Sequence, residues 1–185
     1  MRIEPIIPVV RREPFDDPGW LFELKWDGFR GIADTVNGRM LSKNKNQFRK
    51  FDRLLRMLPP GCVFDGEIVA LDADGRPLFN NLLFGRGDPV YVAFDILFAN
   101  GRDVRAEPLT RRKALLKKTL GKRTLQSDYI VGESGSLFNC VRTFDLEGIV
   151  AKRMTDPYAL HTKWFKILNR EYSQKINRAE LFKKR

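Results

Sequence analysis

Lys25 is the residue of this 185-residue chain whose type and position best suit covalent chemistry. The apolar run Trp20 to Leu24 predicts a strand, Asp27-Gly28 a turn, and Phe29 to Ala33 a returning strand, so Lys25 is expected at the mouth of a hairpin. Strands are depleted in lysine. One interpretation is an edge-strand lysine that blocks aggregation. The other is a nucleophile, because partial burial beside other cations favours the unprotonated amine that can attack phosphorus.

Three further charged residues interrupt apolar runs in the same way: Glu67, Glu147 and Lys166. Burying an unpaired charge costs free energy, so four such residues in one chain indicate strands that line a shared polar pocket. This pattern favours the nucleophile interpretation of Lys25.

The elements that must position these residues are predicted from apolar periodicity. Strands are expected at 20–24, 29–33, 38–42, 62–71, 90–98, 129–131, 147–153 and 164–168, and helices at 51–58, 109–120 and 136–144. The strand 90–98 is expected to be central, and the basic residues of helix 109–120 are expected to point outward. Because the helices fall between groups of strands, the pattern predicts an α+β fold of antiparallel β-sheets packed with helices, with the pocket between sheets.

The length predicts a single domain over residues 1–185, with 1–19 as an extended lead-in and 169–185 as a basic tail. No apolar run is long enough to cross a bilayer and no signal-peptide core is present, so a cytoplasmic protein without membrane contact is expected. Cys62 and Cys140 have no metal-ligand spacing, and both are predicted to be buried. A single histidine excludes sites built on paired histidines.

The charge of the chain is strongly basic, with a net charge of +11 and a pI near 9.9. Residues 39–56 hold seven basic side chains against one acid, residues 102–123 nine against two, and residues 161–185 eight against two. One such cluster is typical of a solvated face, whereas three in a small chain favour binding to nucleic acid.

Five motifs in a fixed order make the chain recognisable. They are Lys25-Trp26-Asp27-Gly28, Phe64-Asp65-Gly66-Glu67, Tyr91-Val92-Ala93-Phe94-Asp95, Glu147 to Arg153, and Trp164-Phe165-Lys166. In these motifs the chain resembles the nucleotidyltransferase (adenylation) domain of ATP-dependent DNA ligases, especially the bacterial ligase D type. The resemblance covers essentially the whole chain and implies an ATP-grasp-like nucleotidyltransferase fold around a nucleotide pocket.

The resemblance also implies the roles of the residues that would act on ATP. Lys25 would attack the α-phosphate and form a lysyl-AMP phosphoramidate, and Lys166 would contact that phosphate. Glu147, together with Glu67, would hold Mg²⁺ or Mn²⁺, for which carboxylates are natural ligands.

For the nucleoside, the resemblance implies that Glu23 faces the adenine, that Phe94 stacks on it, and that Arg30 and Glu67 hold the ribose hydroxyls. AMP would then pass to the 5′-phosphate of a nicked DNA duplex. The side chains expected to grip this DNA are Lys43, Lys45, Arg49, Lys50, Lys152 and Arg153.

The chain departs from the family pattern at three points. Leu168 stands where relatives usually carry a second lysine, which could move a phosphate contact to Lys163 or Lys152, and Lys43 replaces an arginine. No OB-fold domain is expected within the 185 residues, so a monomer that relies on a partner protein or a separate OB-fold domain is predicted. Two alternatives stay open. One is an RNA ligase or capping-type nucleotidyltransferase, and the other is a nucleic-acid-binding module of the same fold with weak or lost catalysis.

Overall fold

The computed structural model describes residues 3–121 and 124–175. Its elements are β1 (Val9–Val10), β2 (Asp17–Leu24), β3 (Phe29–Asp34), β4 (Arg39–Ser42), η1 (Arg49–Met57), β5 (Val63–Ala70), α1 (Phe79–Leu83), β6 (Pro89–Ala99), β7 (Arg102–Asp103), α2 (Leu109–Leu120), β8 (Leu125–Gln126), β9 (Tyr129–Gly132), α3 (Ser134–Thr143), β10 (Gly148–Arg153) and β11 (Phe165–Leu168). Residues 176–185 of the predicted basic tail lie outside the described part.

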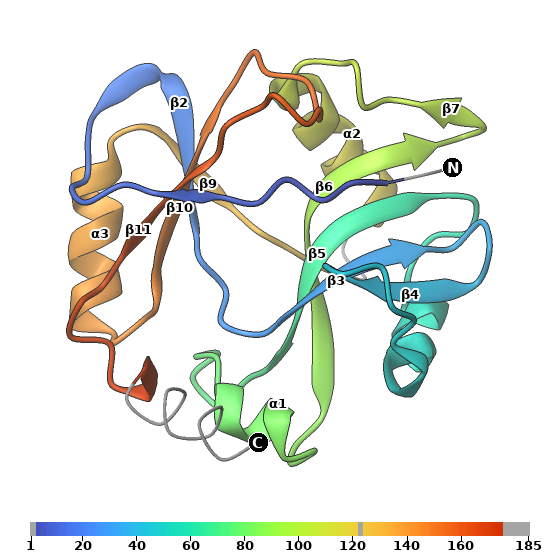
Figure 1. Ribbon diagram of the computed structural model, residues 1–185, viewed down its shortest axis with the longest axis horizontal. Coiled ribbons are helices and arrows are strands. Elements are labelled where there is room, and N and C mark those ends of the chain that lie inside the picture. The colour runs from blue at the N-terminus through green and yellow to red at the C-terminus, as the bar shows by residue number, and fades with distance from the viewer. Residues whose placement is uncertain (1–2, 122–123, 176–185) are drawn as a thin grey trace.

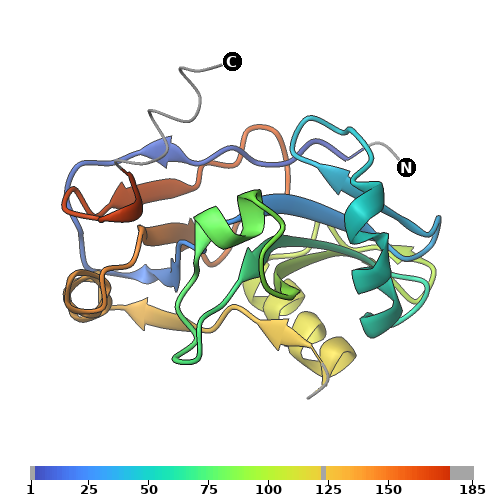
Figure 2. The same ribbon diagram turned by 90° about the horizontal axis from the view of Figure 1, so that it is seen from below.

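The strands form two sheets, and the α+β prediction is confirmed. One sheet has the order β1-β11-β10-β2-β9, and the other has the order β4-β3-β5-β6-β7 with β8 also paired to β6. Neighbouring strands are antiparallel except for the pairs β1–β11 and β6–β8. Figure 1 shows the sheets side by side, with α3 on the outer flank of the first, and Figure 2 shows α2 and η1 against the second.

The predicted hairpin around Lys25 is wrong, because its two strands belong to different sheets. β2 pairs with β10 and β9, whereas β3 pairs with β4 and β5. Residues 25–28 therefore cross from one sheet to the other. The crossing requires glycine at position 28, where a Cβ atom would lie 2.0 Å from the carbonyl oxygen of Ile68.

The alternation of side chains along the strands separates the core from the pocket. Along β2, Trp20 and Phe22 pack with α3, and Glu23 points to the opposite side of the sheet. In β10 the same rule places Ile149 and Ala151 in that core. The alternate side chains of β2 and β10 line the space between the two sheets, together with side chains of β3, β5 and β6.

Several secondary-structure predictions need correction. The strands that were not predicted, β1, β7 and β8, have two residues each, which is too short for a periodic signal. The predicted helix 51–58 is a 3₁₀ helix over Arg49–Met57, and the short helix α1 was not predicted. β6 has strands on both sides in its sheet, so the predicted central strand is confirmed.

Two burial predictions are also wrong. Cys62 is buried, but Cys140 is exposed on α3. In α2, the basic residues Arg112 and Lys113 point inward and are only 1% and 4% exposed, because each has an acidic partner on a neighbouring strand.

None of the helices formed by residues 3–121 and 124–175 is both long and apolar enough to span a membrane.

Candidate active site

A cavity of about 230 Å³ lies between the two sheets and gathers most of the predicted site residues. From the predicted nucleotide site, it is lined by Glu23, Lys25, Arg30, Glu67, Phe94 and Lys166. From the predicted DNA-binding set, it is lined by Lys43 and Lys152. Ile7 and Pro8, in the segment that leads into β1, also line it.

Lys25 lies just beyond the C-terminal end of β2, and its side chain contacts Glu147. The Lys25 Nζ atom is 2.6 Å from Glu147 Oε2, and the two side chains are 23% and 12% exposed. Two strands fix this pair, because the backbone amide of Lys25 donates to the carbonyl of Gly148 at 2.9 Å. The Lys25 side chain is therefore held in place by Glu147 and is exposed enough to reach a molecule in the cavity.

Glu67 provides a second carboxylate close to this pair. The pKa of Glu67 is raised to about 7, mainly by desolvation on burial and also by the nearby charge of Glu147, whereas the cations of Lys25 and Arg30 oppose the shift. The carboxylates of Glu67 and Glu147 are close enough to interact electrostatically, so an additional cation beside them would be stabilised.

Arg30 is held rigidly at the wall of the cavity by Asp65. Its guanidinium forms a bidentate pair with that carboxylate, with both N–O distances at 2.5 Å. Asp65 is fully buried and also accepts a hydrogen bond from the Tyr158 hydroxyl at 2.6 Å. Burial by itself lowers the pKa of Arg30, but the Asp65 carboxylate outweighs this and holds it above its ordinary value.

Phe94 lies on β6 at an irregularity in the pairing of β5 with β6. Asp65 pairs with Asp95 and Gly66 pairs with Ala93, so Phe94 is the extra residue between them. Its ring packs edge-on against Trp164. The Arg30 guanidinium lies 4.6 Å from the ring centre and the Lys152 ammonium 4.4 Å from it, so a base stacked on Phe94 would share the ring with these cations.

Lys152 occupies a different place from the one predicted. It was expected on a DNA-binding surface, but it is only 1% exposed and its ammonium is 3.0 Å from the Glu23 carboxylate inside the cavity. Desolvation lowers the pKa of Lys152 to about 8, with Glu23 acting in the opposite direction. Period-2 alternation in β10 explains the burial, because Arg153, the next residue, is exposed.

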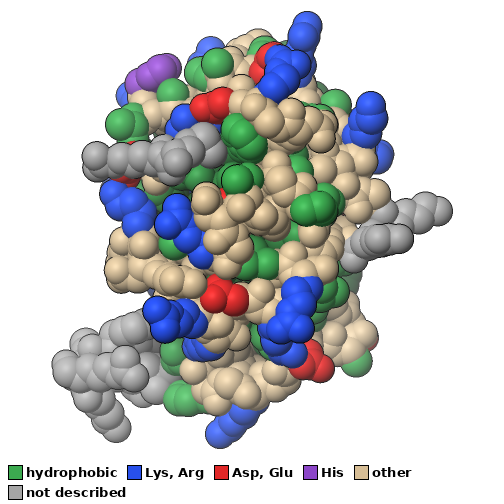
Figure 3. Space-filling view, turned by 90° about the vertical axis from the view of Figure 1, so that its right-hand side faces the viewer, with side chains coloured by type: hydrophobic (Ala, Val, Ile, Leu, Met, Phe, Trp, Pro, Cys, Tyr) green, Lys and Arg blue, Asp and Glu red, His purple; other side chains and the backbone are tan. Residues whose placement is uncertain are grey.

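The remaining predicted DNA-binding residues lie on the surface. Lys43, Lys45, Arg49, Lys50 and Arg153 are exposed. The first four belong to the region of β4 and η1, on the side that faces the viewer in Figure 3, where Lys and Arg side chains are spread among few Asp and Glu. Lys45 also contacts Glu4 at 3.0 Å.

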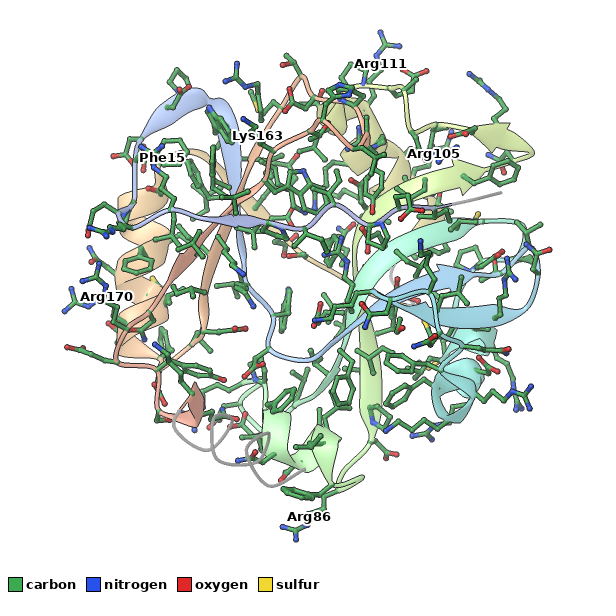
Figure 4. The ribbon with its side chains drawn as sticks, viewed as in Figure 1. Phe15, Arg86, Arg105, Arg111, Lys163 and Arg170 are labelled. Carbon is green, nitrogen blue, oxygen red and sulfur yellow. The ribbon has the colours of Figure 1, made fainter. Side chains whose placement is uncertain are left out.

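The structure separates the two lysines that could compensate for Leu168. Lys152 lines the cavity, whereas Lys163 is exposed two residues before β11 and is not among the cavity-lining residues (Figure 4). Leu168, at the other end of β11, pairs with Gly148.

The carboxylates of Glu67 and Glu147 fit a divalent metal only if a bound molecule or water supplies its other ligands. The described residues contain no group of three or more potential protein ligands. Mg²⁺ commonly uses one or two carboxylates and completes its shell with phosphate oxygens and water. Glu147 and Glu67 therefore fit a metal that enters with a nucleotide.

Some residues that build the site carried no assigned role from the sequence. Asp65, Tyr158, Arg112 and Lys113 all make buried charged or polar contacts, and those of Asp65 and Lys113 are to the cavity residues Arg30 and Glu23. Asp95, in the middle of the apolar strand β6, was a usable signal, because a buried carboxylate requires a cationic partner, here Arg112.

The chain matches a known family over most of its length. Residues 12–167 match the family described as ATP dependent DNA ligase domain. The SPbeta prophage-derived DNA ligase-like protein LigB of Bacillus subtilis is 29% identical, over 94% of this chain and 70% of that protein. The multifunctional non-homologous end joining protein LigD of Mycolicibacterium smegmatis is 34% identical, over 75% of this chain and 20% of that protein.

Solved structures give the same result. The ligase domain of LigD from M. tuberculosis has a TM-score of 0.75 and 28% identity, covering 88% of this chain and 58% of that chain. A mycobacterial DNA ligase D complexed with ATP and MES has a TM-score of 0.75 and 26% identity, covering 89% and 60%. The chain thus spans less than two thirds of these structures. By its motifs, its fold and its match over residues 12–167, the chain belongs to the ATP-dependent DNA ligase domain family.

Proposed function

We propose that this chain performs the adenylation step of an ATP-dependent DNA ligase, with Lys25 as the nucleophile. The observation that carries the proposal is the pair of Lys25 and Glu147 beside a cavity lined by cations from both sheets. This cavity would bind ATP.

The proposed step proceeds as follows. The Lys25 ammonium first releases a proton to solvent, and Glu147, 2.6 Å away, holds the Lys25 side chain at the cavity. The neutral amine attacks the α-phosphorus of ATP, an N–P bond forms, and the bond from that phosphorus to the bridging oxygen of the β-phosphate breaks, so that pyrophosphate leaves with the electron pair. Lys166 supplies positive charge against the negative charge that develops on the phosphoryl oxygens.

The other site residues would bind and orient the nucleotide. Arg30, locked by Asp65, and the half-buried Glu67 would hold the ribose hydroxyls, while Phe94 would stack on the adenine ring and Glu23 would face its edge. A magnesium or manganese ion, when bound by Glu147 and Glu67 with the phosphates, would supply further charge neutralisation.

The substrate that receives AMP would be the 5′-phosphate at a nick in duplex DNA. The exposed basic residues on the side of β4 and η1, together with Arg153, would grip the phosphate backbone. We propose that the chain acts as a monomer in the cytoplasm, with an OB-fold domain or a partner protein completing the grip on DNA.

The experiment is covalent labelling with α-labelled ATP and Mg²⁺, followed by a chase with nicked duplex DNA. Wild-type protein should be labelled, Lys25→Ala should not, and the exposed-site control Lys117→Ala should behave as wild type. A folded wild-type protein that binds nicked DNA without acquiring label would refute the enzyme proposal and support the binding-module alternative. Labelling by GTP and not by ATP would support the capping-type alternative.

A further inference from the structure

The carboxylate of Glu23 lies between two buried lysines that come from different elements. Lys113 Nζ, on α2, is 2.6 Å from Glu23 Oε1, and Lys152 Nζ, on β10, is 3.0 Å from Oε2. Glu23 is 1% exposed and Lys113 is 4% exposed. The adenylation step described above makes no use of Lys113.

Attaching α2 to the sheet does not explain why Lys113 is buried, because Arg112 already performs that task. The Arg112 guanidinium donates to both oxygens of Asp95, at 2.8 and 2.9 Å, and to the carbonyls of Glu107 and Asp156, at 2.5 and 3.0 Å. Apart from Glu23, Lys113 donates only a long hydrogen bond of 3.3 Å to the Ser127 carbonyl among the described residues. The contact with Glu23 is therefore the principal one that Lys113 makes.

Glu23 has acceptor capacity left over for a ligand. Within residues 3–121 and 124–175, its Oε1 atom receives no well-aligned hydrogen bond, although the Lys113 ammonium is close. A carboxylate has about four acceptor positions, and the two lysines do not use all of them. Because Glu23 lines the cavity, an N–H donor on a bound molecule can use the remainder.

The chemistry of this acceptor selects among purines. Adenine carries an amino group at position 6, which donates, whereas guanine and hypoxanthine carry a carbonyl there, which a carboxylate repels. A site built to accept a hydrogen bond discriminates strongly against a ligand that cannot donate one.

We propose that Lys113 is a specificity-determining positioning residue that fixes the Glu23 carboxylate to accept the 6-amino group of adenine. The proposal rests on the proposed function, since it places a nucleotide in this cavity. Without Lys113, Glu23 keeps its pair with Lys152, so the carboxylate remains compensated but loses its fixed orientation.

The test compares covalent nucleotide transfer, measured by intact-protein mass spectrometry, from three triphosphates: ATP, purine riboside triphosphate (hydrogen at position 6) and ITP (carbonyl at position 6). The variants are Lys113→Met, Lys113→Gln, the conservative Lys113→Arg, and the matched control Lys117→Met at an exposed position of α2. Circular dichroism and thermal unfolding verify that each variant is folded.

For Lys113→Met and Lys113→Gln we expect the half-saturating ATP concentration to rise by about tenfold, while the rate at saturation changes by less than about threefold. The preference for ATP over purine riboside triphosphate should fall by about tenfold, and Lys113→Arg should restore most of it. Lys117→Met should match wild type.

Two results would overturn the inference. In the first, wild type is labelled, and Lys113→Met and Lys113→Gln either keep its preference among the three triphosphates or lose transfer from all three equally. Lys113 then does not set specificity, and the proposed function stands. If wild type takes label from none of the three, the proposed function and this inference are both wrong.

Discussion

Replacing Asp65 by asparagine would leave the Arg30 guanidinium without its counter-charge at the wall of the cavity. The carboxylate of Asp65 is fully buried, and the Arg30 side chain is only 13% exposed. Removing one partner of a buried ion pair typically costs about 3–5 kcal/mol. Asparagine keeps one acceptor oxygen, so we expect the lower end for Asp65→Asn, about 3 kcal/mol. For a chain of this size, that corresponds to a fall in Tm of about 6–12 °C.

The assay is thermal unfolding and urea denaturation of Asp65→Asn beside a matched control, Asp88→Asn. Asp88 pairs with Arg53 at 3.3 Å on the surface, and its side chain is 93% exposed, so this control should unfold as wild type does. Adding Arg30→Met to Asp65→Asn removes the uncompensated charge and should cost less than the sum of the two single changes. An Asp65→Asn protein that melts within about 2 °C of wild type would refute the argument that the buried pair holds Arg30.

Three further predictions concern other parts of the site and fold. The pKa of Glu67 is raised from an ordinary 4.5 to about 7 in the folded protein. The folded state therefore has stability below pH 4.5 that is lost as the pH rises through 7. Between these pH values, the free energy of unfolding of wild type should therefore fall by about 2 kcal/mol relative to that of Glu67→Gln, as measured by urea titrations. The same pH dependence in both proteins would contradict this. Gly66→Ala should lower the free energy of unfolding by about 1–3 kcal/mol in the same denaturation assay, because its Cβ would lie 2.5 Å from the Tyr91 ring. The control Gly135→Ala, on α3, adds a Cβ that contacts nothing and should be neutral or stabilising. A thiol reagent should modify exposed Cys140 in the native protein and Cys62 only after unfolding, and rapid native reaction at both would be inconsistent with the fold.

The sequence allowed the longer strands and the pocket to be predicted for clear physical reasons. Runs of β-branched and aromatic residues such as Val90 to Phe98 fit a buried strand and little else. Charged residues within such runs need partners, so Lys25, Glu67 and Lys166 indicated a shared pocket, and the structure brings them to one cavity.

Long-range pairing explains most of what could not be predicted. Nothing local shows that β2 pairs with β10, more than a hundred residues away, in place of its sequence neighbour β3. Helix periodicity assigned Arg112 and Lys113 to solvent, because their partners, Asp95 and Glu23, lie on strands that the helix meets only in the folded chain. The same dependence on tertiary contacts decides which residue of the pair Lys152 and Arg153 faces the cavity.

The most direct test of the central claim is to locate AMP on the protein by peptide mass spectrometry after incubation with ATP and Mg²⁺. The cavity holds other lysines, among them Lys152, whose pKa is lowered to about 8 by desolvation, so the measurement discriminates between real candidates. Because Lys25 is the partly exposed lysine paired with Glu147, AMP is expected on the peptide that contains Lys25 and on no other. AMP on the peptide containing Lys152, or no modified peptide from folded protein, would contradict the account.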